Sequence, residues 1–332
     1  MKAFALFAVI LASTFSSFGG PPTWQELNSH LYTNGPIVWQ APTNNLPTSL
    51  WIYKRLPPRP FLATVISNAA VLASLQNKEL PKPSTNAFFI NSTPDPCGMG
   101  FSIFSIQPAS TTISFSSTNQ ILSTGNVLDD DTVTRLAFEY AARFGLNRTY
   151  LIPKNVYTGS NGAGCDGTLT NGICTRGILL SRKLDGVAFF SADNEADSVE
   201  GFSIEFGGGG QIRSFSLVWP NLERCQSASS ASPQQIINYI RAHKAIVLPA
   251  PDEEDYFARL KTLATAKKLT ITKITPYYGE GIIGEVPTND LPPEFVTPFA
   301  ELEAVADFGN SNAVVQLVSP ILSSEVNRLL AK

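Results

Sequence analysis

The chain has 332 residues, of which 43% are hydrophobic and 15% charged, and its formal net charge is −3 at pH 7. Disordered proteins combine low hydrophobicity with high net charge, so this composition excludes a disordered chain. The slight negative charge gives no electrostatic basis for binding nucleic acid or anionic lipid, and we expect neither partner. The length suffices for two domains with cores of their own.

The first residues follow the order of a secretory signal peptide. Lys2 provides a positive start, residues 3–18 are mainly apolar, and small residues precede Pro21. The apolar run is shorter than the roughly 20 residues that span a bilayer. We therefore predict a signal peptide over residues 1–19 and a secreted or extracytoplasmic protein with no membrane attachment after the signal is removed.

Two helices are expected next, at residues 23–32 and 63–78. In the second, Val65, Ala69 and Leu72 recur at the spacing of one helix face. Several prolines between the two segments forbid a continuous helix. The pattern therefore favours two short helices that each bury one face.

Strands are expected from residue 101 onward, because residues 101–106 and 112–116 are β-rich and flank a turn, as in a hairpin. An acidic triplet at residues 129–131 then precedes a helix over residues 132–144. Carboxylates at a helix N-terminus accept hydrogen bonds from free N–H groups and complement the helix dipole, so we interpret the triplet as a cap rather than a cation site. Gly145 is a suitable end for this helix.

Two turn signals follow. Asp185-Gly186 between apolar runs predicts a hairpin. Glycines 207–210 separate strands expected at residues 201–206 and 211–219. A glycine-rich loop binds phosphate when a helix begins after it; here a strand follows, so we expect no phosphate site.

Residues 132–219 resemble the secreted regulatory modules of the PepSY and protease-propeptide type. The resemblance rests on an apolar strand with an Asp-Gly turn at residue 185, the strand over residues 201–206, the glycine turn and a further strand. It implies a non-catalytic module that binds or restrains a partner protein, and it transfers no catalytic residue to this chain. The long loop at residues 159–172 departs from the family pattern.

The last third of the chain begins with residues 227–232, which are small and polar and predict a linker. The elements expected after it are a helix at 234–244 preceded by Ser232-Pro233, a helix at 252–268, a strand at 270–275, a hairpin of 300–308 with 313–318, and a helix at 323–330. These patterns together predict an α+β protein of two regions, with helices packed on antiparallel sheets. The first region would be a domain over residues 20–226, and the second a smaller α+β domain over residues 233–332.

The four cysteines form an even set in a chain expected to be exported, so disulfides are the favoured interpretation. They are Cys97, Cys165, Cys174 and Cys225. Three pairings are possible; we favour Cys165–Cys174, because the segment between them can fold back as a hairpin, with Cys97–Cys225 as the second bond. A metal site is the alternative, but no C-x-x-C pair or nearby histidine supports it, and no metal is predicted.

Common catalytic motifs are missing from the sequence. The two histidines, His30 and His243, belong to no zinc-hydrolase motif, and no G-x-S-x-G motif is present. The best acidic pair is Glu280 and Glu285, beside tyrosines that could stack on sugar. A second acidic group, formed by Asp193, Glu195, Asp197 and Glu200, lacks the calcium-loop spacing of an EF-hand and is interpreted as a solvated loop.

We therefore predict a secreted, non-enzymatic binding or regulatory protein that needs no cofactor and whose partner is a secreted protein. The alternative is a secreted carbohydrate-active hydrolase that uses Glu280 and Glu285. Asn91 and Asn147 begin N-glycosylation sequons, which apply if the host is eukaryotic.

Overall fold

The computed structural model describes residues 35–44, 46–75, 82, 85–95, 98–117, 127–160, 173–189, 200–248, 263–280, 282–283, 286–287 and 295–323. The predicted signal peptide, the helix expected at 23–32, and most of the helices expected at 252–268 and 323–330 lie outside these residues. No helix of the described part is long and apolar enough to cross a membrane.

The described chain is mainly β, and sixteen of its strands form one sheet. The strands of this sheet are β1 (Ile37–Trp39), β2 (Ser49–Arg55), β3 (Ala87–Asp95), β4 (Gly98–Gln107), β5 (Thr112–Ser117), β6 (Leu151–Pro153), β7 (Tyr157–Ser160), β8 (Ile173–Leu184), β9 (Val187–Phe189), β10 (Gly201–Phe206), β11 (Ile212–Val218), β12 (Leu222–Ser229), β13 (Ile246–Val247), β14 (Lys268–Glu280), β17 (Phe295–Asp307) and β18 (Asn312–Pro320). Their main order is β12-β2-β17-β14-β9-β8-β10-β11-β5-β4-β3, so β12 and β3 end the row. A separate short pair joins β15 (Ile282–Ile283) to β16 (Val286–Pro287).

The expected α+β architecture, with helices packed on antiparallel sheets, is wrong. The sheet is mixed, since β14 pairs in parallel with both β1 and β9. Three α-helices occur among the described residues: α3 (Ala63–Leu72), α4 (Asp130–Arg143) and α5 (Pro233–Arg241). A short polar segment such as β12 is a strand because it pairs with the distant strand β2, which its own composition does not reveal.

Local capping signals placed the starts of two helices close to the observed ones: α4 begins at Asp130 where 132 was predicted, and α5 at Pro233 where 234 was predicted. The side chain of Asp129 accepts a hydrogen bond from the backbone N–H of Thr132 at 2.7 Å, which begins α4. Ser232 and Gln235 form a reciprocal capping box at the start of α5. Helix α3 ends at Leu72, earlier than expected, and the N–H of Leu75 then bonds to the carbonyl of Ala70 at 2.8 Å.

Both predicted turns are confirmed. Asp185 and Gly186 adopt φ values of 49° and 86°, the left-handed pair that joins β8 to β9 as a two-residue hairpin. The glycine run joins β10 to β11, with Gly209 and Gly210 at positive φ. The hairpin expected near residue 310 is also present as β17 and β18.

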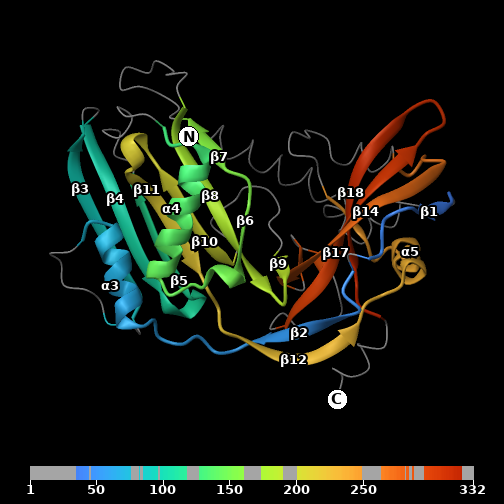
Figure 1. Ribbon diagram of the computed structural model, residues 1–332, viewed down its shortest axis with the longest axis horizontal. Helices are drawn as coiled ribbons and strands as arrows, with labels where there is room; N and C mark the ends of the chain where they lie inside the picture. Colours follow the sequence, from blue (N-terminus) through green and yellow to red (C-terminus); the bar gives the residue numbers. More distant parts are fainter. Residues whose placement is uncertain are drawn as a thin grey trace, which may run out of the picture.

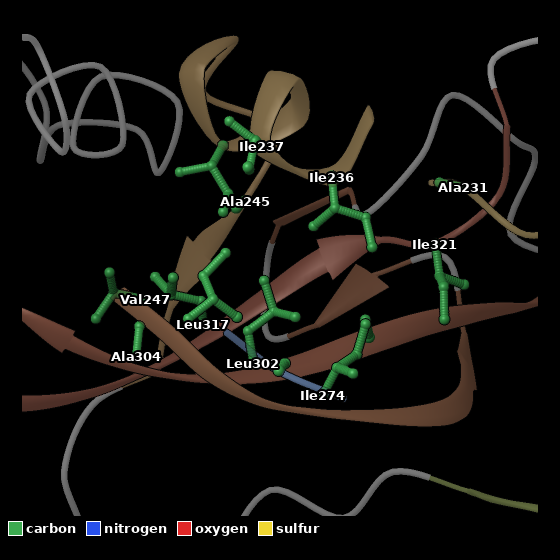
Figure 2. Close-up of a cluster of buried hydrophobic side chains, with 14 of the residues drawn as sticks. Ala231, Ile236, Ile237, Ala245, Val247, Ile274, Leu302, Ala304, Leu317 and Ile321 are labelled. Carbon is green, nitrogen blue, oxygen red and sulfur yellow. The ribbon is translucent and has the colours of Figure 1, made fainter. Parts of the chain in front are cut away.

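The sheet buries two hydrophobic cores, one in each half (Figure 1). In the first, α3 and α4 cover one face of the sheet from β4 to β8, and its buried aromatic residues are Phe104, Phe115, Phe144, Phe202, Phe206 and Phe215. In the second, α5 lies over β17 and β18, with Ile236, Leu302 and Leu317 in the layer between them (Figure 2). Strand β9 connects the halves, because it pairs with β8 on one side and β14 on the other.

The segment at residues 227–232, expected to be a linker, is bonded into the structure instead. Its first residues complete β12, which pairs with β2, and the N–H of Ala231 donates to the carbonyl of Ile321 at 2.6 Å. Strands from before and after this segment share one sheet, since β2 also pairs with β17. The first three of the small polar residues that suggested a linker, residues 227–229, belong to the edge strand β12.

Replacement of Gly201 by alanine should destabilise the protein strongly. A Cβ atom there would lie 2.3 Å from the backbone oxygen of Leu180 on the neighbouring strand, which neither strand can relieve without moving. Gly186→Ala is the matched control, since that position has positive φ but open space around it, and it should cost about 1 kcal/mol. Urea unfolding should show that Gly201→Ala costs at least about 2 kcal/mol more than Gly186→Ala; equal losses would contradict the close approach.

Candidate functional site

A buried carboxylate joins the two halves of the sheet. Glu200, directly before β10, is 5% exposed, and Nη2 of Arg55 on β2 lies 2.5 Å from its Oε1. Nη1 of Arg182 on β8 lies 3.3 Å from its Oε2 and also donates to the carbonyl of Pro220 at 2.6 Å. Burial lowers the pKa of Arg182, while the charge of Glu200 opposes that shift. Its guanidinium also stacks over the ring of Trp219, 4.5 Å from the centroid.

The expectation of a solvated acidic loop is therefore wrong for Glu200, because its carboxylate is enclosed between two arginines. Asp193, Glu195 and Asp197 lie outside the described residues. The position of Glu200 next to β10 decides the difference, since that strand inserts between β8 and β11.

A second network also begins on β2 and joins it to β12, β14 and the β8–β9 turn. The hydroxyl of Tyr53 on β2 donates to Oδ2 of Asp185 at 2.5 Å, and Arg224 on β12 pairs with the other oxygen of that carboxylate. The guanidinium of Arg224 stacks on Trp51 at 5.3 Å. The ring of Tyr278 meets Tyr53 edge to face at 5.4 Å, and its hydroxyl accepts the N–H of Trp51 at 3.2 Å.

Burial, reinforced by the hydrogen bond to Asp185, raises the pKa of Tyr53 to about 12. Burial also raises the pKa of Tyr278. Both hydroxyls thus hold their protons well above neutral pH, so neither is suited to act as a base. The two networks hold β2 and β12 against the β8–β9 turn, which makes them a structural joint.

The described residues hold no group of three or more histidine, cysteine, aspartate or glutamate side chains that could bind a metal ion. Glu280 ends β14, whereas Glu285 lies outside the described residues, so the predicted hydrolase pair stays a prediction. Exposed His243 follows α5 with a φ of 57°, and His30 lies outside the described part.

The predicted disulfides stay predictions. Cys225 is an exposed free thiol on β12, and Cys174 lies on β8. Cys97 and Cys165, the expected partners, are outside the described residues.

The glycosylation sequons also stay predictions. Asn91 is part of β3. Exposed Asn147 precedes the short 3₁₀-helix η3 (Arg148–Tyr150), where its side-chain oxygen accepts the N–H of Thr149 at 2.9 Å.

Sequence reasoning missed the most exposed apolar surface. Four of the nine exposed large hydrophobic residues of the described chain lie on the β3–β4 hairpin. We call them the apolar patch: Phe88 (63% exposed), Ile90 (65%), Phe101 (46%) and Ile103 (44%). Ile90 pairs directly with Ile103, and Phe88 lies two residues along the same face. Their neighbours Phe89 and Phe104 face the opposite way, into the helix-covered core, with ring centroids 6.1 Å apart.

This end of the sheet is nearly free of charge. Strands β3, β4 and β5 contain one charged residue, Asp95, at the last position of β3. Strand β3 ends the row of strands and pairs only with β4 among the described residues (Figure 1). It therefore presents a free backbone edge beside exposed apolar side chains, a combination that favours pairing with another strand.

Comparison with protein-family models finds no matching family, and comparison with curated proteins finds no matching relative. The resemblance to PepSY-type modules consequently stays a prediction.

Removing the charge of Glu200 should destabilise the fold. Glu200→Gln removes the carboxylate that faces the buried guanidinium of Arg182 and the partly buried guanidinium of Arg55, and it should cost about 3 kcal/mol or more in the free energy of unfolding. The matched control is Glu139→Gln, which breaks an exposed pair with Arg135 on α4 and should cost less than about 0.5 kcal/mol. Urea unfolding of both variants measures the difference. A loss of stability in Glu200→Gln no larger than that in Glu139→Gln would show that the ion pairs of Glu200 do not hold the two halves of the sheet together.

Tyr53 should make stability depend on pH in the alkaline range. Its pKa is about 12 in the folded protein, against about 10 for an unfolded tyrosine, so unfolding releases a proton between these values. The contribution is complete below pH 10 and is lost as pH rises toward 12. Between pH 8 and pH 11, the urea midpoint of the wild type should therefore fall more than that of Tyr53→Phe. Equal decreases would show that Tyr53 is not responsible.

Proposed function

We propose that this is a non-enzymatic binding protein, and that it binds by accepting an uncharged, extended polypeptide strand along β3. The observation that carries the proposal is the apolar patch beside the edge of β3, which pairs with no second strand among the described residues and whose single charged residue is Asp95 at its end. An edge strand offers unpaired N–H and C=O groups, which supply affinity when another strand is added, and side chains beside it supply specificity.

The chemistry of β3 defines the partner. Residues 83–94 contain no charged residue, so an incoming charged side chain would find no counterion on this strand. The exposed side chains of Phe88, Ile90 and Ile103 instead favour apolar residues at alternate positions of the incoming strand. The leader-like first residues support a secreted partner.

The joint around Glu200 and Asp185 supports binding rather than catalysis. Each of these carboxylates is paired with arginine, and the tyrosine hydroxyl that joins Asp185 keeps its proton. A paired carboxylate is a weak general base, so these networks are suited to holding strands together.

Binding should depend on Ile90. The probe is a fluorescein-labelled peptide of about ten residues that alternates valine and threonine, the length of a long strand. Fluorescence anisotropy should show saturable binding by the wild type, weakened at least about tenfold by Ile90→Lys, since the ammonium group would lie against an apolar strand. The control Val314→Lys changes a 60% exposed residue on β18 and should bind like the wild type.

Absence of saturable binding by the wild type at protein concentrations where it sediments as a monomer, or equal binding by Ile90→Lys, would overturn the proposal. Polysaccharide hydrolysis by the purified protein that is lost in Glu280→Gln would also overturn it and favour the carbohydrate-active alternative.

A further inference from the structure

We infer that the strand accepted by β3 belongs to a second copy of this chain, so that two β3 strands pair antiparallel about a two-fold axis. The inference rests on the proposed function and names its partner. The contact is isologous, which means that the same surface of each copy must fit itself.

Strand β3 is compatible with itself in charge. Two copies that meet along residues 87–94 bring no like charges together, because this stretch carries none. Each copy supplies the uncharged, apolar strand that the edge favours. A two-fold axis perpendicular to the sheet also leaves both apolar patches on the same face, where Ile90 and Ile103 of each copy continue one apolar surface across the junction.

Pro94 indicates the register. A proline is tolerated within a paired strand where its nitrogen faces away from the partner strand. Because alternate residues direct their amides to the same side, Pro94 places the N–H groups of Phe88, Ile90 and Ser92 on the free side of β3. Pairing centred on Ile90 uses all three residues in each copy, with Phe88 opposite Ser92 and Ile90 opposite Ile90.

The other end of the sheet is protected against the same pairing. Strand β12 carries charged Glu223 and Arg224, and its register shifts at Cys225, as in a β-bulge. Charges and bulges are the devices by which proteins prevent edge-to-edge association. An isologous contact uses the β3 edge of both copies, so association through it closes at two copies and does not continue into a filament; among the described residues, the opposite end of this row is the protected β12.

Sedimentation velocity tests the register directly with opposite charges at one position. The wild type and the control Val314→Lys should show the same concentration-dependent dimer. Ile90→Lys and Ile90→Glu should each sediment as monomers, with dissociation constants raised at least about tenfold, because like charges would face each other across the axis. An equimolar mixture of Ile90→Lys and Ile90→Glu should recover the dimer, since opposite charges then meet. Circular dichroism and thermal unfolding confirm that each variant is folded.

A wild type that stays monomeric at every concentration would overturn the inference, as would an Ile90→Lys variant that dimerises like the wild type. Failure of the mixture to recover the dimer would overturn pairing of β3 with β3 at Ile90. A monomeric wild type that still binds the valine–threonine peptide would refute the second copy alone and leave strand addition in place. A monomer that binds no peptide would refute both proposals.

Discussion

The carboxylate of Glu200, shared between Arg55 on β2 and Arg182 on β8, ties together parts of the chain that are far apart in sequence. Moving a charge out of water costs several kcal/mol, and this cost is offset only when the opposite charges are placed correctly. A different arrangement of the strands would leave at least one of these charges buried and unpaired. The neighbouring pair of Asp185 and Arg224 adds β12 to the same joint. The continuous sheet therefore depends on a small number of charge pairs, and the two hydrophobic cores form on either side of them.

The same arrangement separates the two ends of the sheet chemically. At the β12 end, Glu223, Arg224 and the bulge at Cys225 protect the edge. At the β3 end, the helices α3 and α4 cover one face, and the other face carries exposed Phe88 and Ile90, on strands β3 to β5 whose single charged residue is Asp95. Exposed apolar surface on an uncharged edge is a liability in an isolated molecule, so its presence is best explained by association with another strand.

Local patterns predicted the parts of the fold whose chemistry is local. Asp129 caps α4 by bonding a residue three positions away, and Asp185-Gly186 forms its turn because both residues tolerate positive φ. The predictions failed where pairing is long-range. Residues 227–229 have the composition of a linker, yet they form a strand because β2, more than 170 positions earlier, supplies the hydrogen bonds. The α+β assignment failed for the same reason. Hydrophobic periodicity in the sequence predicts helices, whereas short polar strands have no such pattern.

The candidate site shows the same division. From the residues alone, Phe88, Phe89 and Ile90 are three consecutive apolar residues, and an apolar run gives no indication of which side chain faces the core. Likewise, nothing in the neighbourhood of Glu200 distinguishes it from the acidic residues before it. The sequence alone established where helices and tight turns begin, because those depend on contacts within a few residues. Which apolar residues are exposed, which carboxylate is buried and which edge is open were established by the packing of strands and helices distant in the chain, because burial and hydrogen bonding between strands are properties of that packing.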